Sequence, residues 1–139
     1  MKLLSLLFVL PFCLVFNQAK AQTFTEKDII GNWTVIEVLS SKPNNDTEKK
    51  VVAGFKNSTF VFNTDHTFEL KSTDKSIYIT MLSRQLVKAQ WMYSANNNEI
   101  KIGTPQNNYS ILNIEMQHKG EATQFILKES NISLVVKKN

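Results

Sequence analysis

Short segments in which apolar and polar residues alternate follow one another along most of this chain. Alternation with a period of two is typical of β-strands that bury one face. The segments "TFVFN" (59–63) and "TFELK" (67–71) flank a polar turn, so they predict a hairpin in which His66 takes the left-handed backbone conformation. One face of this hairpin carries four apolar side chains: Phe60, Phe62, Phe68 and Leu70.

Further segments of the same kind extend to residue 137 and are separated by stretches rich in Asn, Ser, Thr and Gly. In order they are 33–40, 76–82, 86–94, 99–103, 109–117, 122–129 and 132–137. Many short, evenly spaced strands are typical of an antiparallel barrel or sandwich. The sequence therefore predicts an all-β fold, either an antiparallel barrel or an antiparallel sandwich.

One short helical turn is predicted before the first strand. Thr25 can cap the segment "EKDII", with Asp28 at the capping-box position and Gly31 ending the turn. No other helix is expected. The polar stretch 40–54 is interpreted as a long loop between the first two strands.

Residues 1–21 are predicted to be a cleaved signal peptide, which leaves residues 22–139 as a single domain. A basic start precedes the apolar run 3–16, and the small residues Ala19 and Ala21 provide a cleavage site. A membrane anchor and a lipid-modified Cys13 are the alternatives. The run is short for a membrane span, and Phe12 is bulky where lipid processing needs a small residue. We expect export to the periplasm or the medium, with no transmembrane segment in the mature chain.

The composition of residues 22–139 excludes several classes of function. Lys2 and Lys20 fall in the leader, so residues 22–139 contain 14 of the 16 basic residues and all 12 acidic ones. Their net charge is +2. This charge is too small to indicate a nucleic-acid partner. The sole cysteine is Cys13, so the domain has neither disulfides nor thiol chemistry and depends on an ordinary core.

The segment "DIIGNWTVIEV" (28–38) places Gly31 two residues before Trp33 at the entrance to the first strand. The glycine allows the chain to bend tightly, and the indole is expected to plug the narrow end of the barrel. A helical turn, then Gly-x-Trp, then a series of antiparallel strands resembles the lipocalin family, and the compact bacterial lipocalin-like proteins most of all. The resemblance implies that residues 22–139 form one lipocalin-like domain, an eight-stranded antiparallel up-and-down barrel with 132–137 as an extra C-terminal strand.

Two further motifs belong to this resemblance. Asn107, Asn108 and Tyr109 are similar to the lipocalin motif of Thr or Asn, Asp and Tyr before the seventh strand, although Asn108 lacks the charge of the usual aspartate. Lys128 stands where the family has an arginine that stacks on the tryptophan.

The resemblance implies that these motif residues, with Gly31 and Trp33, cluster at one end of the barrel and that residues 40–56 lie at the other. It also implies that Lys128, rather than Arg84, lies over the Trp33 ring.

No catalytic, metal or cofactor site is expected. The strand order predicted above puts His66 at the closed end of the barrel and His118 at the open mouth, too far apart to share an ion. The carboxylates Glu69, Glu99 and Glu115 alternate with apolar residues and are interpreted as an outer, solvated face. Nucleophile elbows, phosphate loops and dinucleotide fingerprints are absent from the sequence.

The remaining candidates are apolar side chains that would line a calyx: Phe60, Phe62, Phe68, Leu70, Ile77, Ile79, Met81, Trp91 and Tyr93. The same residues could equally fill a small barrel. The first hypothesis is noncovalent binding of a small hydrophobic molecule or lipid. The second is an envelope protein with a filled interior that contacts another protein through mouth loops or a strand edge, and an enzyme ranks third.

Overall fold

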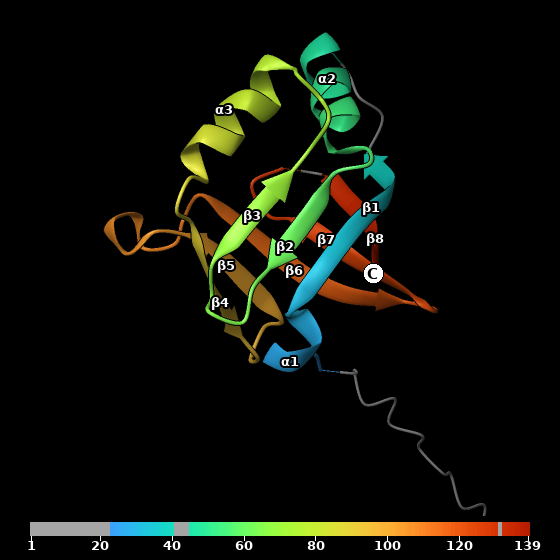
Figure 1. Cartoon of the computed structure of the whole chain (residues 1–139). Helices are drawn as coiled ribbons and strands as arrows, with labels where there is room; N and C mark the ends of the chain where they lie inside the picture. The colour runs from blue at the N-terminus through green and yellow to red at the C-terminus, as the bar shows by residue number, and fades with distance from the viewer. Residues whose placement is uncertain (1–22, 41–44, 131) are drawn as a thin grey trace, which may run out of the picture.

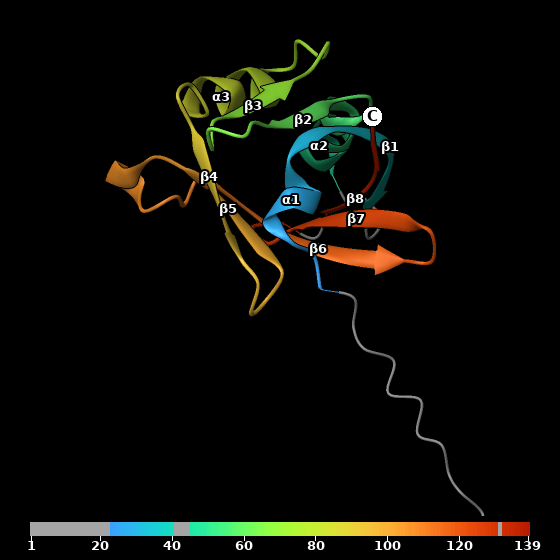
Figure 2. The ribbon, with the colours of Figure 1, turned by 60° about the horizontal axis from the view of Figure 1, so that its bottom comes forward.

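The computed structural model describes residues 23–40, 45–130 and 132–139, and these residues form a nearly closed antiparallel β-barrel. The all-β barrel prediction is thus confirmed, whereas the predicted signal peptide lies outside the described residues. Helix α1 (Glu26–Ile29) lies at one end, and helices α2 (Asp46–Phe55) and α3 (Ile77–Gln85) lie at the other (Figure 1). We call these the α1 end and the α2/α3 end. Viewed from the α1 end, α1 sits in the middle of the ring of strands (Figure 2).

The eight strands form one sheet in the order β3-β2-β1-β8-β7-β6-β5-β4, and all described pairings are antiparallel. Their bounds are β1 Gly31–Ser40, β2 Thr59–Phe62, β3 Phe68–Lys71, β4 Gln90–Ser94, β5 Glu99–Gly103, β6 Leu112–Lys119, β7 Ala122–Leu127 and β8 Ile132–Lys138. A short 3-10 helix, η1 (Pro105–Asn107), follows β5.

The edge strands β3 and β4 meet along a short seam. The backbone N–H of Phe68 donates to the Ala89 carbonyl at 2.9 Å, and the Trp91 N–H donates to the His66 carbonyl at the same distance. The rest of the barrel wall is continuous, because β8 pairs with β1 along most of the length of both strands.

The predicted hairpin and helical turn are confirmed. β2 and β3 pair with Phe60 opposite Leu70, and His66 has the expected positive φ of 65°. At α1, the Thr25 side chain accepts a hydrogen bond from the Asp28 N–H while the Asp28 carboxylate accepts one from the Thr25 N–H. Both features are local, so turn and capping residues determine them.

The prediction of a strand over 76–82 is wrong, because this segment begins helix α3. Ser76 caps the helix by accepting a hydrogen bond from the Ile79 N–H. The buried residues Ile79, Leu82 and Leu86 have helical spacing and pack toward the core. Almost every residue of this segment is apolar, so its sequence fits a strand and a helix equally well. The helix forms because it buries Ile79, Leu82 and Leu86 together.

Because a helix replaces one predicted strand, every later strand runs opposite to the predicted direction. Segment 132–138 is consequently not an extra strand. It is β8, the eighth strand of the barrel, and it closes the wall against β1. Turns that were expected at one end of the barrel therefore lie at the other.

The interpretation of 40–54 as a loop is wrong in its second half, which forms α2, and the prediction of a single helix fails with it. Asn45 caps α2, since its side-chain oxygen accepts a hydrogen bond from the Glu48 N–H at 2.8 Å. The Asn-x-x-Glu spacing is a capping signature that could have revealed this helix. Phe55, at the end of α2, is fully buried in the core.

The core consists of interlocked aromatic rings. Phe125 lies at its centre, with ring centroids 5.4 Å from Trp33, 5.7 Å from Phe60 and 6.2 Å from Phe62. Phe62 in turn contacts Trp91 edge to face. Such tilted and edge-on contacts are the favoured arrangement of aromatic pairs.

Among the described residues, every helix is too short or too polar to cross a membrane.

Candidate functional site

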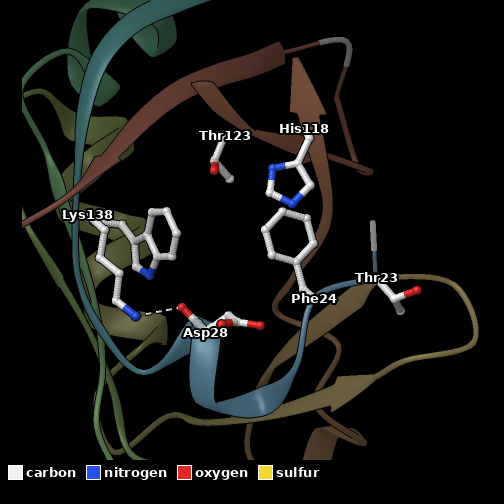
Figure 3. Close-up of a pocket in the computed structure, with 7 residues that line it drawn as sticks. Thr23, Phe24, Asp28, His118, Thr123 and Lys138 are labelled. Carbon is white, nitrogen blue, oxygen red and sulfur yellow. Dashed lines mark hydrogen bonds between the residues drawn. The ribbon is translucent and has the colours of Figure 1, made fainter. Parts of the chain in front are cut away.

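A pocket of about 270 Å³ opens at the α1 end, and it is the candidate site (Figure 3). Its residues come from the chain before α1, from α1, and from strands β1, β6, β7 and β8. They are Thr23, Phe24, Asp28, Trp33, His118, Thr123 and Lys138. We call it the α1-end pocket. The predicted candidates included only Trp33 from this set.

Trp33 and Lys138 form one side of the α1-end pocket. Trp33 is 5% exposed, and its indole Nε1 donates to the Ile29 carbonyl at 2.7 Å. Lys138 pairs with Trp33 across β1 and β8, and its Nζ lies 5.5 Å from the Trp33 ring centroid. The same ammonium donates to the Asp28 carbonyl at 2.7 Å. These contacts fix the Lys138 side chain over the rim of the pocket.

The cation over Trp33 is thus Lys138, and the prediction of Lys128 is wrong. Lys128 follows β7 at the turn to β8, and its ammonium lies 3.7 Å from the Glu99 carboxylate. Arg84 is on α3, at the other end of the barrel. The error follows from the strand order, because the strand that closes on β1 is 132–138 rather than 122–129.

Phe24 and His118 form the opposite side of the α1-end pocket. Their rings stack with centroids 4.1 Å apart and an interplanar angle of 16°. The Tyr93 hydroxyl donates to the Phe24 carbonyl at 2.7 Å, and burial raises the pKa of this phenol. Phe24 precedes the capping residue Thr25, a position that often carries an apolar residue packed onto the helix, and this signal could have identified it.

Asp28 supplies the negative charge of the α1-end pocket. Its carboxylate accepts hydrogen bonds from the hydroxyl and the backbone N–H of Thr25, each at 2.7 Å. These bonds lower the pKa of Asp28, and attraction to Lys138 and His118 lowers it further. The carboxylate is therefore held in its ionised form beside two basic side chains.

Both histidines contact the α1 segment, so the prediction that they lie at opposite ends of the barrel is wrong. His66 Nε2 is 2.8 Å from a Glu26 carboxylate oxygen, and the His66 ring stacks on Trp91 at 4.6 Å. His118 moves to this end because the later strands are reversed. In the described part of the chain, no group of three His, Cys, Asp or Glu side chains is placed to hold a metal ion.

The predicted calyx residues separate into three groups. Phe60, Phe62, Phe68, Leu70 and Trp91 are buried and contact one another or the rest of the core. Ile79 is buried on the inner face of α3, and Tyr93 is half-buried beside Phe24. Ile77 and Met81 are exposed on α3. In a strand residues 77, 79 and 81 would share one face, but in a helix residue 79 lies opposite 77 and 81.

The motif residues do not form one cluster. Gly31 and Trp33 lie at the α1 end, where β1 begins. Asn107, Asn108 and Tyr109 follow β5, and register places that turn at the α2/α3 end, since β6 begins there beside the end of β7. Lys128 is at this end too. The part of 40–56 that forms α2 lies away from Trp33, as predicted.

The three strand carboxylates differ in exposure. Glu69 is exposed and Glu115 is half-buried, but Glu99 is only 7% exposed. Glu99 has the outward parity of Lys101 on β5, yet Lys128 and Asn97 cover it, Asn97 donating to it at 2.6 Å. Two turn residues thus bury a carboxylate that alternation placed on a solvated face.

The α1-end pocket combines flat apolar surfaces with a few hydrogen-bonding groups. Phe24, His118 and Trp33 provide the rings, while Thr123 and Asp28 provide a hydroxyl and a carboxylate. This composition suits noncovalent binding of a small ring-bearing molecule. No family model, curated protein or solved structure matches the chain. The kinship with lipocalins therefore stays a prediction, and the site is interpreted from its geometry.

Proposed function

We propose that this protein is exported and binds a small, partly apolar molecule noncovalently in the α1-end pocket. The observation that carries the proposal is the hollow of about 270 Å³ between the stacked Phe24–His118 rings and the Trp33–Lys138 pair. Ligand sites are typically concave, with aromatic walls and a few convergent polar groups, and this hollow has those properties. Export is supported by the leader-like sequence of residues 1–21.

The size and lining of the pocket limit the class of ligand. Small-molecule sites usually measure about 300 to 1,000 Å³, so this pocket suits a molecule with about one ring. The ring would lie against Phe24 and Trp33, and a polar substituent would meet the Thr123 hydroxyl or the His118 ring. Binding would come from burial and stacking, without covalent chemistry.

The centre of the barrel is a weaker candidate for the same activity. Its aromatic side chains contact one another across the interior, Phe60 and Phe62 both against Phe125. A ligand there would have to displace close-packed rings, which costs free energy. The α1-end pocket requires no such rearrangement.

Native mass spectrometry of protein purified from its own host tests the proposal by detecting a retained small molecule. Ligand-observed NMR with a panel of single-ring aromatic compounds provides the affinity. Thr123→Leu should fill the pocket and reduce retention and binding about tenfold or more, by steric exclusion. Thr73→Leu, the same change at an exposed position beyond β3, is the matched control. Equal binding by wild-type protein and Thr123→Leu would refute the site, and binding by neither would refute the function.

A further inference from the structure

Helix α3 presents an apolar outer face at the α2/α3 end. Its inward side chains, Ile79, Leu82 and Leu86, are buried. On the opposite side of the helical wheel, Ile77 and Met81 lie four residues apart, and they are 76% and 54% exposed. Arg84 completes this face. α3 contains no acidic residue, and the charge on its exposed side is basic.

The positive charge of the protein is concentrated around this helix. Segment 71–88 contains a single acidic residue, Asp74, and four basic ones: Lys71, Lys75, Arg84 and Lys88. This surplus exceeds the net charge of +2 on residues 22–139, so the remainder of the domain has no positive excess.

The cations of this segment are largely available to a partner. Within the described ranges Lys75, Arg84 and Lys88 form no ion pair, whereas Lys71 lies 3.7 Å from Glu69. The Asp74 carboxylate accepts a hydrogen bond from the Ser76 N–H at the start of α3.

We propose that the outer face of α3 docks on an anionic phospholipid surface. Helices that lie in a membrane interface combine exposed apolar side chains with flanking Lys and Arg residues, and α3 has both. Ile77 and Met81 would enter the boundary between headgroups and acyl chains, while Lys75, Arg84 and Lys88 would meet lipid phosphates. Charge complementarity selects this partner, because a neutral surface would leave those cations without counter-charges.

Docking through α3 would orient the barrel. Helices α1 and α3 lie at opposite ends of the barrel (Figure 1), so docking through α3 would keep the α1-end pocket away from the bilayer. The docking surface and the pocket share no residue, and the docking proposal is independent of the proposed function.

A tryptophan placed on α3 gives a local test. In an Ile77→Trp variant of the protein as its host produces it, vesicles of phosphatidylglycerol and phosphatidylcholine with brominated acyl chains should quench the new indole and shift its emission to the blue. Trp33 and Trp91 are buried and should contribute little change. Met92→Trp, at a 48% exposed position on β4, is the matched control and should not respond. Circular dichroism checks that both variants are folded.

Charge and competing partners are tested in the same assay. Replacing Arg84 and Lys88 by Gln in the Ile77→Trp variant should raise the lipid concentration for half-maximal quenching about 25-fold, since each basic residue near an anionic surface contributes about fivefold. Absence of quenching, equal quenching at position 92, or equal quenching by pure phosphatidylcholine would each overturn the proposal. A blue shift that grows with protein concentration before lipid is added would instead assign the face to a second copy of the chain.

Discussion

Replacement of Gly31 by Ala should destabilise the barrel through two separable effects. Gly31 has a φ of +133°, a conformation that residues with a Cβ rarely adopt, so the backbone alone should cost about 1 to 3 kcal/mol. In addition, the new methyl group would lie 2.8 Å from Lys138 Cε, which forces that side chain to move.

The displaced Lys138 would lose its contact with Trp33 and its hydrogen bond to the Asp28 carbonyl. At an exposed site such a cation–π contact is worth about 0.5 to 1 kcal/mol, and the hydrogen bond adds a similar amount. We therefore expect Gly31→Ala to lower the free energy of unfolding by about 2 to 5 kcal/mol in total.

Urea denaturation followed by tryptophan fluorescence measures these effects in a double-mutant cycle with Lys138→Ala. In the Lys138→Ala background Gly31→Ala should cost about 1 to 2 kcal/mol less than in the wild type, because no lysine remains to be displaced. Gly120→Ala is the matched control. Gly120 also has a positive φ, but a methyl group there meets no atom within 4 Å, so its cost should not depend on Lys138. A cost for Gly31→Ala that is the same in both backgrounds would refute the reasoning.

Four further outcomes are expected. Gly54→Ala should cost about 1 to 3 kcal/mol by overpacking against Ile79, and Ile79→Ala should remove that penalty; a thermal melt that Gly54→Ala leaves unchanged would contradict the helix packing. Phe125→Ala should cost about 3 to 5 kcal/mol in urea unfolding, because its ring is central to the core. Thr25→Ala should cost about 0.5 to 2 kcal/mol at pH 7 through loss of the α1 cap. The pKa of Asp28 is lowered in the fold, so its stabilisation should be fully present above the unfolded-state pKa of 3.8. It should disappear as the pH falls through the folded-state value. The free energies of unfolding of Asp28→Asn and the wild type should therefore converge in acid.

Sequence signals that depend only on neighbouring residues correctly predicted the local structures they encode. The β2–β3 hairpin follows from alternation around a polar turn, and the Thr25–Asp28 cap follows from a spacing of three residues. Segment 76–82 was mispredicted because apolar residues at 77, 79, 81 and 82 satisfy a strand and a helix alike. Its helical burial depends on contacts with the core and with α2, which no local pattern records.

The candidate site could be predicted only in part, because its residues are distant in the chain. Trp33 follows from the Gly-x-Trp motif. His118 was predicted at the wrong end because one segment was misassigned as a strand. The same error left 132–137 as an extra strand, so Lys138 was not expected beside β1. Thr123 had no distinguishing feature of its own, since it is one of many threonines on strands.

The pairing of β1 with β8 has a consequence for the order in which the barrel can fold. Lys138 and Asp28 are 110 residues apart, so these contacts close a very long loop, whereas β2–β3 closes a short one. During synthesis β1 is made early, yet its second edge stays without a partner until β8 is complete. Closure should therefore be the slow step, on the millisecond-to-second scale of proteins dominated by non-local strand pairs. A nascent chain halted before β8 would expose the edge of β1 to other chains.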